Sequence, residues 1–167
     1  MSFADDVNRF VMKTKNKIKV AFSESANRLF SQIVMRTPTY FDHEPTSGHT
    51  KFNWQASTNG SATERPGTDK QGDATITAIK AVTSVLSLEN LRVYLANPTE
   101  AATWLEYGLY PKSPRRGSFN TQTGQYEIRS AGGFSLQAPS GMVRVSAADW
   151  GNIVREVASQ VYTRGSI

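Results

Sequence analysis

The first candidate site in this sequence consists of two histidines and a glutamate: His43, Glu44 and His49. Imidazole nitrogens and carboxylate oxygens are zinc ligands, and a helical zinc motif places its two histidines at positions i and i+4. Here they are six positions apart in "PTYFDHEPTSGHT", residues 38–50, a stretch rich in turn-forming residues. We therefore expect no metal site. A metal-dependent hydrolase would need this loop ordered around an ion.

Other catalytic patterns are also missing from the sequence. Ser140 in "APSGM" lacks the G-x-S-x-G setting of a nucleophile elbow, and no glycine-rich phosphate-binding or dinucleotide-binding fingerprint occurs. The absence of cysteine excludes thiolate nucleophiles and thiolate metal sites. We expect no catalytic residue, no cofactor and a protein that is not an enzyme.

Glu106 is the acidic residue whose position most needs explaining. It lies in "ATWLEYG" near the end of a helix predicted over residues 100–107, which Thr99 caps and the left-handed Gly108 ends. A carboxylate there opposes the helix dipole, so a positive or donating group should face it. Glu106 could accept hydrogen bonds from backbone amides or an arginine and so hold the next loop. It could also contact another subunit, or act in catalysis with a second carboxylate or a histidine.

A long amphipathic helix is predicted to precede this region, from Phe3 to Arg36. Its apolar residues recur at three- and four-residue steps, and it ends near Arg36 because Pro38 disfavours helical backbone at Thr37. The apolar positions are Phe3, Val7, Phe10, Val11, Ile18, Phe22, Leu29 and Ile33.

Basic residues line both edges of this apolar stripe. Arg9, Lys13 and Lys17 fall on one flank and Lys15 and Lys19 on the other. They could be solvated, with their methylene stems along the stripe. They could also face DNA or an acidic partner, because no acid occurs between Asp6 and Glu24 to neutralise them.

The central part of the chain is predicted to alternate strands and helices. We expect a strand in "KFNWQAST", a mobile surface loop over residues 58–72, and a helix over residues 74–86 capped by Asp73. A second strand in "LRVYLANP" follows and ends at Pro98.

Residues 109–137 are too long for an ordinary connection. A β-hairpin is predicted across Ala131 and Gly132, and Lys112, Arg115 and Arg116 form a basic tip. The tip could grip a neighbouring subunit or phosphate, or be solvated. A last helix is expected from a cap at Ser146 to about residue 163. Its predicted core stripe is Val145, Trp150, Ile153, Val154, Val157 and Val161.

The length, charge and apolar content of the chain limit the class of protein that it can be. The chain has 167 residues, a formal net charge of +5 and a pI near 9.6, and no apolar run or N-terminal pattern typical of a membrane span or secretory signal. We expect one domain, residues 1–167, that works where it is made. Its charge favours polyanions. We expect the bulk of its aromatic residues to lie in the core.

Four sequence segments resemble a known family. They are "RTP" at residues 36–38, Ser47-Gly48 followed by "FNW", "YLAN" followed by "LEYG", and "QAPSGMV" at residues 137–143. Together and in this order they resemble the neck and tail-completion proteins of long-tailed bacteriophages, the head–tail joining or minor tail protein family. This chain departs from that pattern by longer segments at residues 39–48 and 108–137.

The resemblance implies an α+β fold, with a long N-terminal helix and a C-terminal helix packed on a small, mostly antiparallel sheet. Residues 109–137 then form an extended loop or β-hairpin insertion. The implied role is structural: a homo-oligomeric ring around the DNA channel that contacts head-completion (stopper or connector) and tail-terminator proteins. A small basic DNA-binding protein is the alternative. The motif residues of structural importance are Arg36, Pro38, Gly48, Asn53, Trp54, Asn97, Glu106, Tyr107, Gly108, Pro139, Gly141 and Met142. The DNA or partner contacts are Arg9, Lys13, Lys15, Lys17, Lys19, Lys112, Arg115 and Arg116.

Overall fold

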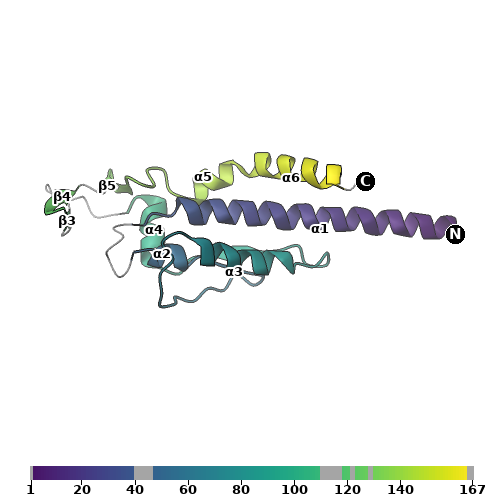
Figure 1. Ribbon diagram of the computed structural model, residues 1–167, viewed down its shortest axis with the longest axis horizontal. Coiled ribbons are helices and arrows are strands. Elements are labelled where there is room, and N and C mark those ends of the chain that lie inside the picture. Colours follow the sequence, from purple (N-terminus) through teal and green to yellow (C-terminus); the bar gives the residue numbers. More distant parts are fainter. Residues whose placement is uncertain (1, 40–46, 110–117, 121–122, 128–129, 165–167) are drawn as a thin grey trace.

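The computed structural model describes residues 2–39, 47–109, 118–120, 123–127 and 130–164 (Figure 1). These residues form an α+β fold with long N- and C-terminal helices and small antiparallel sheets, which confirms the predicted class. The elements are, in order, α1 (Phe3–Arg36), α2 (His49–Phe52), β1 (Gln55–Ser57), α3 (Asp73–Ser84), β2 (Tyr94–Ala96), α4 (Glu100–Tyr107), β3 (Ser118–Asn120), β4 (Gln125–Glu127), β5 (Ser130–Ala131), β6 (Phe134–Ser135), α5 (Val143–Ala148) and α6 (Trp150–Arg164).

Helix α1 spans the residues that the sequence predicted. A capping box starts it, because the Ser2 hydroxyl accepts from the Asp5 amide and the Asp5 carboxylate accepts from the Ser2 amide, at 3.3 and 3.0 Å. Its last residue is Arg36, and the C-cap residue Thr37 has an extended backbone, as expected before Pro38.

Helix α1 is the central element of the described structure (Figure 1). Figure 1 shows α6 along one side of α1 and α3 along the other, while the N-terminal part of α1 projects beyond both. One core cluster lies at the C-terminal end of α1 and contains Phe30, Ile33, Val34, Trp54, Ile79, Leu105, Ala138 and Met142. A second joins α1 to α6 through Ile153, Val157 and Val161, which pack against Ala21 and Leu29. Helix burial therefore supplies most of the stabilising apolar contact.

The described strands form three antiparallel pairs, β1 with β2, β3 with β4, and β5 with β6. Gln55 pairs with Ala96 and Ser57 with Tyr94. The predicted strand over residues 51–57 was wrong in its first half, where the helical turn α2 stands instead. The apparent alternation misled because Gly48, with φ of 84°, starts a turn in which the Phe52 amide donates to the Gly48 carbonyl at 2.9 Å.

The predicted Asp73 cap of α3 was also wrong. Gly72 is the N-cap residue, and the carboxylate of Asp69 accepts from the amides of Gly72 and Thr75 at 2.8 Å each. Burial raises the pKa of Asp69, but the hydrogen bonds from Thr75 and Gly72 lower it below its usual value overall. Asp69, three residues before Gly72, therefore accepts hydrogen bonds at the start of α3, the role that the sequence had assigned to Asp73.

The predicted hairpin near residue 131 is present in shorter form. Strands β5 and β6 flank Gly132 and Gly133, so the turn lies one residue further along than predicted. The β3–β4 hairpin was not predicted. Lys112, Arg115 and Arg116, the predicted basic tip, lie outside the described residues.

The predicted final helix is divided into α5 and α6 at Asp149. Ser146 is buried inside α5 and does not cap it, because its hydroxyl donates back to the Met142 carbonyl at 2.7 Å. Of the predicted core stripe, Val145 and Trp150 are each 36% exposed. Ile153, Val157 and Val161 are buried as expected.

The expectation that most aromatic residues form the core was wrong for the described residues. Phe30 and Trp54 are buried, whereas Phe3, Phe10, Tyr107 and Tyr162 are exposed. Within the described ranges, no helix combines the length and the apolar character that a membrane span requires.

Candidate functional site

Four segments far apart in the sequence meet at the C-terminal end of α1, and they are the segments that carry the family resemblance. We call this region the motif junction. It consists of Arg36, Thr37, Asn53, Trp54, Asn97, Thr99, Glu106, Gly141, Met142 and Arg144.

Glu106 joins α4 to the start of α5. One carboxylate oxygen accepts from the amides of Met142 and Val143 at 2.7 and 2.8 Å. The other accepts from the amide and the Nε of Arg144, both at 3.0 Å. The Arg144 guanidinium also donates to the carbonyl of Glu106. These contacts confirm the structural interpretation that Glu106 accepts from amides and an arginine. They correct its target, because Glu106 holds residues 142–144 and not the segment directly after Gly108.

The electrostatics of Glu106 favour this structural role. Burial alone raises its pKa, but the donors from residues 142–144 outweigh burial and lower the pKa below the usual value. The side chain is 9% exposed and both oxygens are engaged. A carboxylate that stays ionised and already accepts four hydrogen bonds is a poor general base.

Two glycines permit this close approach. Gly141 has φ of 80°, and a Cβ there would lie 2.8 Å from both the carbonyl oxygen and Oε2 of Glu106. Gly108 has φ of 68°, which confirms the predicted left-handed C-cap, and a Cβ there would lie 2.4 Å from the ring of Phe134. The backbone of these segments packs where no side chain fits.

The end of α1 is bonded to two other segments. Arg36 donates to the Ser146 hydroxyl and to the Asp149 carboxylate, both at 3.1 Å, which ties α1 to α5 and to the residue that separates α5 from α6. Thr37 accepts from the indole N–H of Trp54 at 2.7 Å and donates to the Ile33 carbonyl at 2.8 Å. The side chains of Thr37 and Trp54 are buried, as is Pro38.

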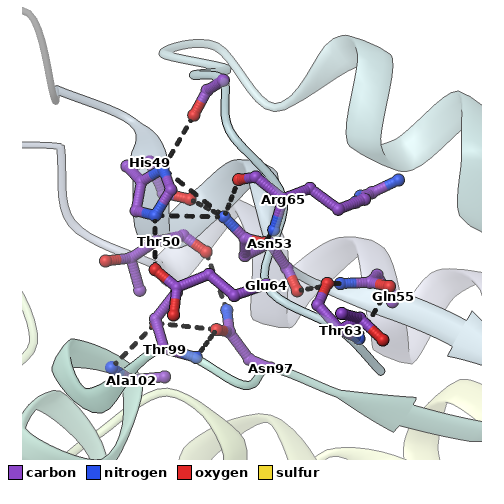
Figure 2. Close-up of polar contacts among 11 residues, drawn as sticks. His49, Thr50, Asn53, Gln55, Thr63, Glu64, Arg65, Asn97, Thr99 and Ala102 are labelled. Carbon is purple, nitrogen blue, oxygen red and sulfur yellow. Dashed lines mark hydrogen bonds and ion pairs between the residues drawn. The ribbon is translucent and has the colours of Figure 1, made fainter. Parts of the chain in front are cut away.

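Asn97 connects β2 to α2 and α4. Its amide group donates to the Thr50 carbonyl at 2.7 Å, and its carbonyl oxygen accepts from the amide and hydroxyl of Thr99 (Figure 2). The Thr99 hydroxyl then accepts from the Ala102 amide at 3.3 Å and caps α4 as predicted.

Asn53 holds the segment between β1 and α3. It is fully buried, its carbonyl oxygen accepts from the Arg65 amide at 2.8 Å, and its amide group donates to the carbonyls of Arg65 and His49 at 3.1 Å (Figure 2). Gln55 bonds the backbone of Thr63 in the same way. The loop predicted over residues 58–72 is therefore tied to the body by side-chain amides.

His49 also holds this loop. Its Nε2 lies 2.9 Å from the Glu64 carboxylate and its Nδ1 lies 2.9 Å from the Gly67 carbonyl (Figure 2). The hydrogen bond to Glu64 and then the one to Gly67 raise the pKa of His49 above its usual value, against a smaller effect of burial. Both acceptors favour the doubly protonated imidazolium.

This contact predicts a pH-dependent attachment of the loop. Because the folded pKa of His49 is raised, its contribution to stability is complete below the unfolded value of 6.5 and is lost as pH rises through the folded pKa. Glu64 is 57% exposed, so we expect at most about 1 kcal/mol. NMR titration of the His49 ring should give a lower pKa in Glu64→Gln than in the unmodified chain. An unchanged pKa would show that Glu64 is not the cause.

The basic residues of α1 lie away from the motif junction, in the half of the helix nearer its N-terminus, and Lys17 lies where the end of α6 meets α1. Arg9 and Asp6 form an exposed ion pair at 3.7 Å, and the Lys17 ammonium lies 5.0 Å from the centre of the Tyr162 ring. Lys13 and Lys15 are exposed and Lys19 is half-buried. The motif residues predicted to be structural and the basic residues of α1 predicted to contact DNA or a partner therefore lie in different parts of the fold.

Three further motif residues lie at the border of the junction. Gly48 begins α2, and its carbonyl accepts from the Asp69 amide at 3.2 Å. Pro139 and Tyr107 are exposed. The Arg144 guanidinium lies 5.7 Å from the centre of the Tyr107 ring.

Sequence reasoning missed Arg144, Arg65 and Asp69. Glu106 predicted that an arginine or amides would face it, but no local spacing identifies Arg144, which is 38 positions away. Asp69 could have been found from its position three residues before Gly72, where an aspartate accepts from a helix start. Arg65 bonds Asn53 through its backbone, and its guanidinium donates to the Phe52 carbonyl at 3.0 Å; no local sequence pattern identifies either contact.

No group of three or more His, Asp or Glu side chains that could hold a metal ion occurs in the part of the chain that the structure describes. His43 and Glu44 lie outside that part. What the motif junction can do chemically is bind chain segments to each other through buried hydrogen bonds. Comparison of the chain with protein-family models, curated proteins and solved structures found no match.

Proposed function

We propose that this chain is a structural virion protein of the head–tail junction of a long-tailed phage. In this role its copies form part of a ring around the DNA channel and allow tails to join DNA-filled heads. It is then located in the neck or at the top of the tail, and in the host cytoplasm during assembly.

The observation that carries the proposal is the motif junction. The four resembling segments were selected from sequence alone, and their residues are bonded to each other: Thr37 to Trp54, Asn97 to Thr50, and Glu106 to Met142. Segments that resemble a family only by chance have no reason to be hydrogen-bonded to one another in the fold. The convergence supports a shared fold and, through it, the shared role.

The projecting part of α1 suits the proposed surroundings. Arg9, Lys13 and Lys15 give it a positive charge, which Lys17 and Lys19 continue to the place where α6 meets α1, and no acid occurs between Asp6 and Glu24. Such a surface attracts DNA phosphates without reading bases, as a channel requires. The proposed protein partners are further copies of the chain, the head-completion (stopper or connector) protein and the tail terminator.

The test is electron microscopy of lysates from a phage that carries a stop codon in this gene. We expect DNA-filled heads and separate tails to accumulate. Intact virions in normal number would contradict the joining role. The same basic residues would then favour the alternative, a small basic DNA-binding protein, which requires tight duplex binding with a steep salt dependence.

A further inference from the structure

The N-terminal half of α1 carries an exposed apolar face. It consists of Phe3, Val7, Phe10, Val11 and Ile18, which we call the apolar stripe; Phe3 is 84% and Phe10 69% exposed. The stripe runs about 22 Å along the helix at about 1.5 Å per residue. Contiguous apolar surface of this kind on an ordered helix marks a contact with another molecule.

The stripe continues the face that α6 covers further along α1. Ala21 and Leu29 of that face pack on α6, and Arg28 binds Gln160 and Glu156 at its edge. The cover ends near Tyr162, whose ring contacts the Lys17 ammonium, and α1 projects beyond it (Figure 1). The stripe therefore has the form of a helix-packing surface, and no other helix of the described residues covers it over residues 3–16 (Figure 1).

An apolar groove runs along α1 and α6, and Ile18 and Tyr162 lie at the end of it where α6 stops covering α1. It has a volume of about 350 Å³ and is lined by Ile18, Phe22 and Ser25 of α1 and by Trp150, Val154 and Tyr162 of α6. Ile18 belongs to both the groove and the stripe. A helix packed on the stripe can therefore place an apolar side chain at the mouth of the groove.

The charges beside the stripe indicate which helix fits. With about 100° per residue, Asp6, Lys13 and Lys17 lie on one flank of the stripe. A parallel copy of α1 related by a two-fold axis would set Lys13 and Lys17 beside Lys15 and Lys19 of the other chain, which places like charges together. An antiparallel copy sets Asp6 of each chain beside Lys13 and Lys17 of the other and opposes the two helix dipoles.

The stripe is also complementary to itself when reversed. A two-fold axis between Phe10 and Val11 sets each of these two residues beside its own copy, Val7 against Thr14, and Phe3 against Ile18 of the second chain. Phe3 of each chain then meets the groove of the other. Arg9, Lys15 and Lys19 stay outside this contact.

We propose that two copies of this chain pair through antiparallel N-terminal halves of α1, with Phe10 and Val11 at the two-fold axis. The pairing does not rest on the head–tail role. Because the contact is two-fold, it differs from the head-to-tail contacts of a cyclic ring, and it describes the chain before assembly.

Sedimentation velocity at increasing concentrations of the full chain is the first test. We expect a monomer–dimer equilibrium that Phe10→Lys weakens about a hundredfold or more, because both copies lose a central aromatic side chain. Asn16→Lys adds the same charge to the opposite face of the same exposed half-helix and should leave the equilibrium unchanged. A monomer at every concentration would overturn the proposal, and so would a dimer insensitive to Phe10→Lys.

Cross-linking decides the orientation, since the chain has no native cysteine. Val7→Cys and Thr14→Cys chains should form a disulfide-linked dimer when mixed, because the antiparallel pairing brings these positions together. Each alone should remain unlinked. Efficient linkage of Val7→Cys to itself would indicate a parallel pair and overturn the proposal. A monomeric chain that binds anionic lipid vesicles through Phe10 would overturn it in favour of a membrane surface.

Discussion

Replacement of Glu106 by alanine should lower the free energy of unfolding by about 4 kcal/mol, because it leaves the buried amide of Met142 and the part-buried donors of Val143 and Arg144 without their shared acceptor. For a chain of this size, the melting temperature should fall by about 10 °C. Assembly of the protein should weaken mainly as a consequence. Thermal and chemical denaturation measure the first effect directly, and unchanged thermal stability would count against the structural role.

Two variants control this experiment. Glu100→Ala makes the same substitution on the same helix at an exposed position of its first turn, and should cost about 0.5 kcal/mol through the helix dipole alone. Glu106→Gln keeps the shape of the side chain but loses its charge, and its amide group places a donor against other donors. We expect it to be nearly as destabilising as Glu106→Ala. A harmless Glu106→Gln would mean that side-chain packing, and not the carboxylate, holds residues 142–144.

The pH dependence of stability gives an independent check of Glu106. Because its folded pKa is lowered, the contribution of Glu106 is complete above the unfolded value of 4.5 and is lost as pH falls through the folded pKa. The unmodified chain should therefore lose more stability in acid than Glu106→Gln does. Parallel stability curves below pH 4.5 would assign acid sensitivity to other groups.

The local parts of the fold were predictable from sequence. The span of α1, the Thr99 cap and the left-handed Gly108 follow from apolar periodicity, cap chemistry and the proline after Arg36, and each depends on residues within a few positions. These predictions were confirmed because local preference and tertiary contacts agree at these places. Glu106 was identified for the same reason: it violates a local rule and so requires a compensating contact.

The parts that failed depend on contacts between distant residues. The turn α2 replaced a predicted strand because Asn53 is fully buried and bonds the backbone of Arg65, which no alternation pattern encodes. Asp69, not Asp73, caps α3 because its carboxylate reaches both Gly72 and Thr75. The exposure of Phe3 and Phe10 could not be predicted either, because periodicity identifies an apolar face but does not show whether another helix covers it.

Gly141→Ala should be the second large effect, at about 3–5 kcal/mol of lost stability. A left-handed backbone costs a residue with a Cβ about 1–2 kcal/mol. The new Cβ would also lie 2.8 Å from the carbonyl oxygen and Oε2 of Glu106, so α4 and the start of α5 must move apart. Since one of these two atoms is the backbone carbonyl oxygen of Glu106, a change of side-chain rotamer cannot relieve the contact. Urea denaturation of the purified variant measures the loss.

Gly124→Ala separates the two causes. Gly124 has φ of 67°, but no atom lies within 4 Å of the position that its Cβ would take. It should therefore cost only the backbone term of about 1–2 kcal/mol. Equal losses at Gly124 and Gly141 would show that the contact with Glu106 contributes nothing. In the double variant Glu106→Ala/Gly141→Ala, the methyl group no longer meets the carboxylate, so the two losses should sum to more than the measured total. Strict additivity would mean that Glu106 and Gly141 act separately, and the motif junction would then lack the coupling between α4 and α5 that its hydrogen bonds imply.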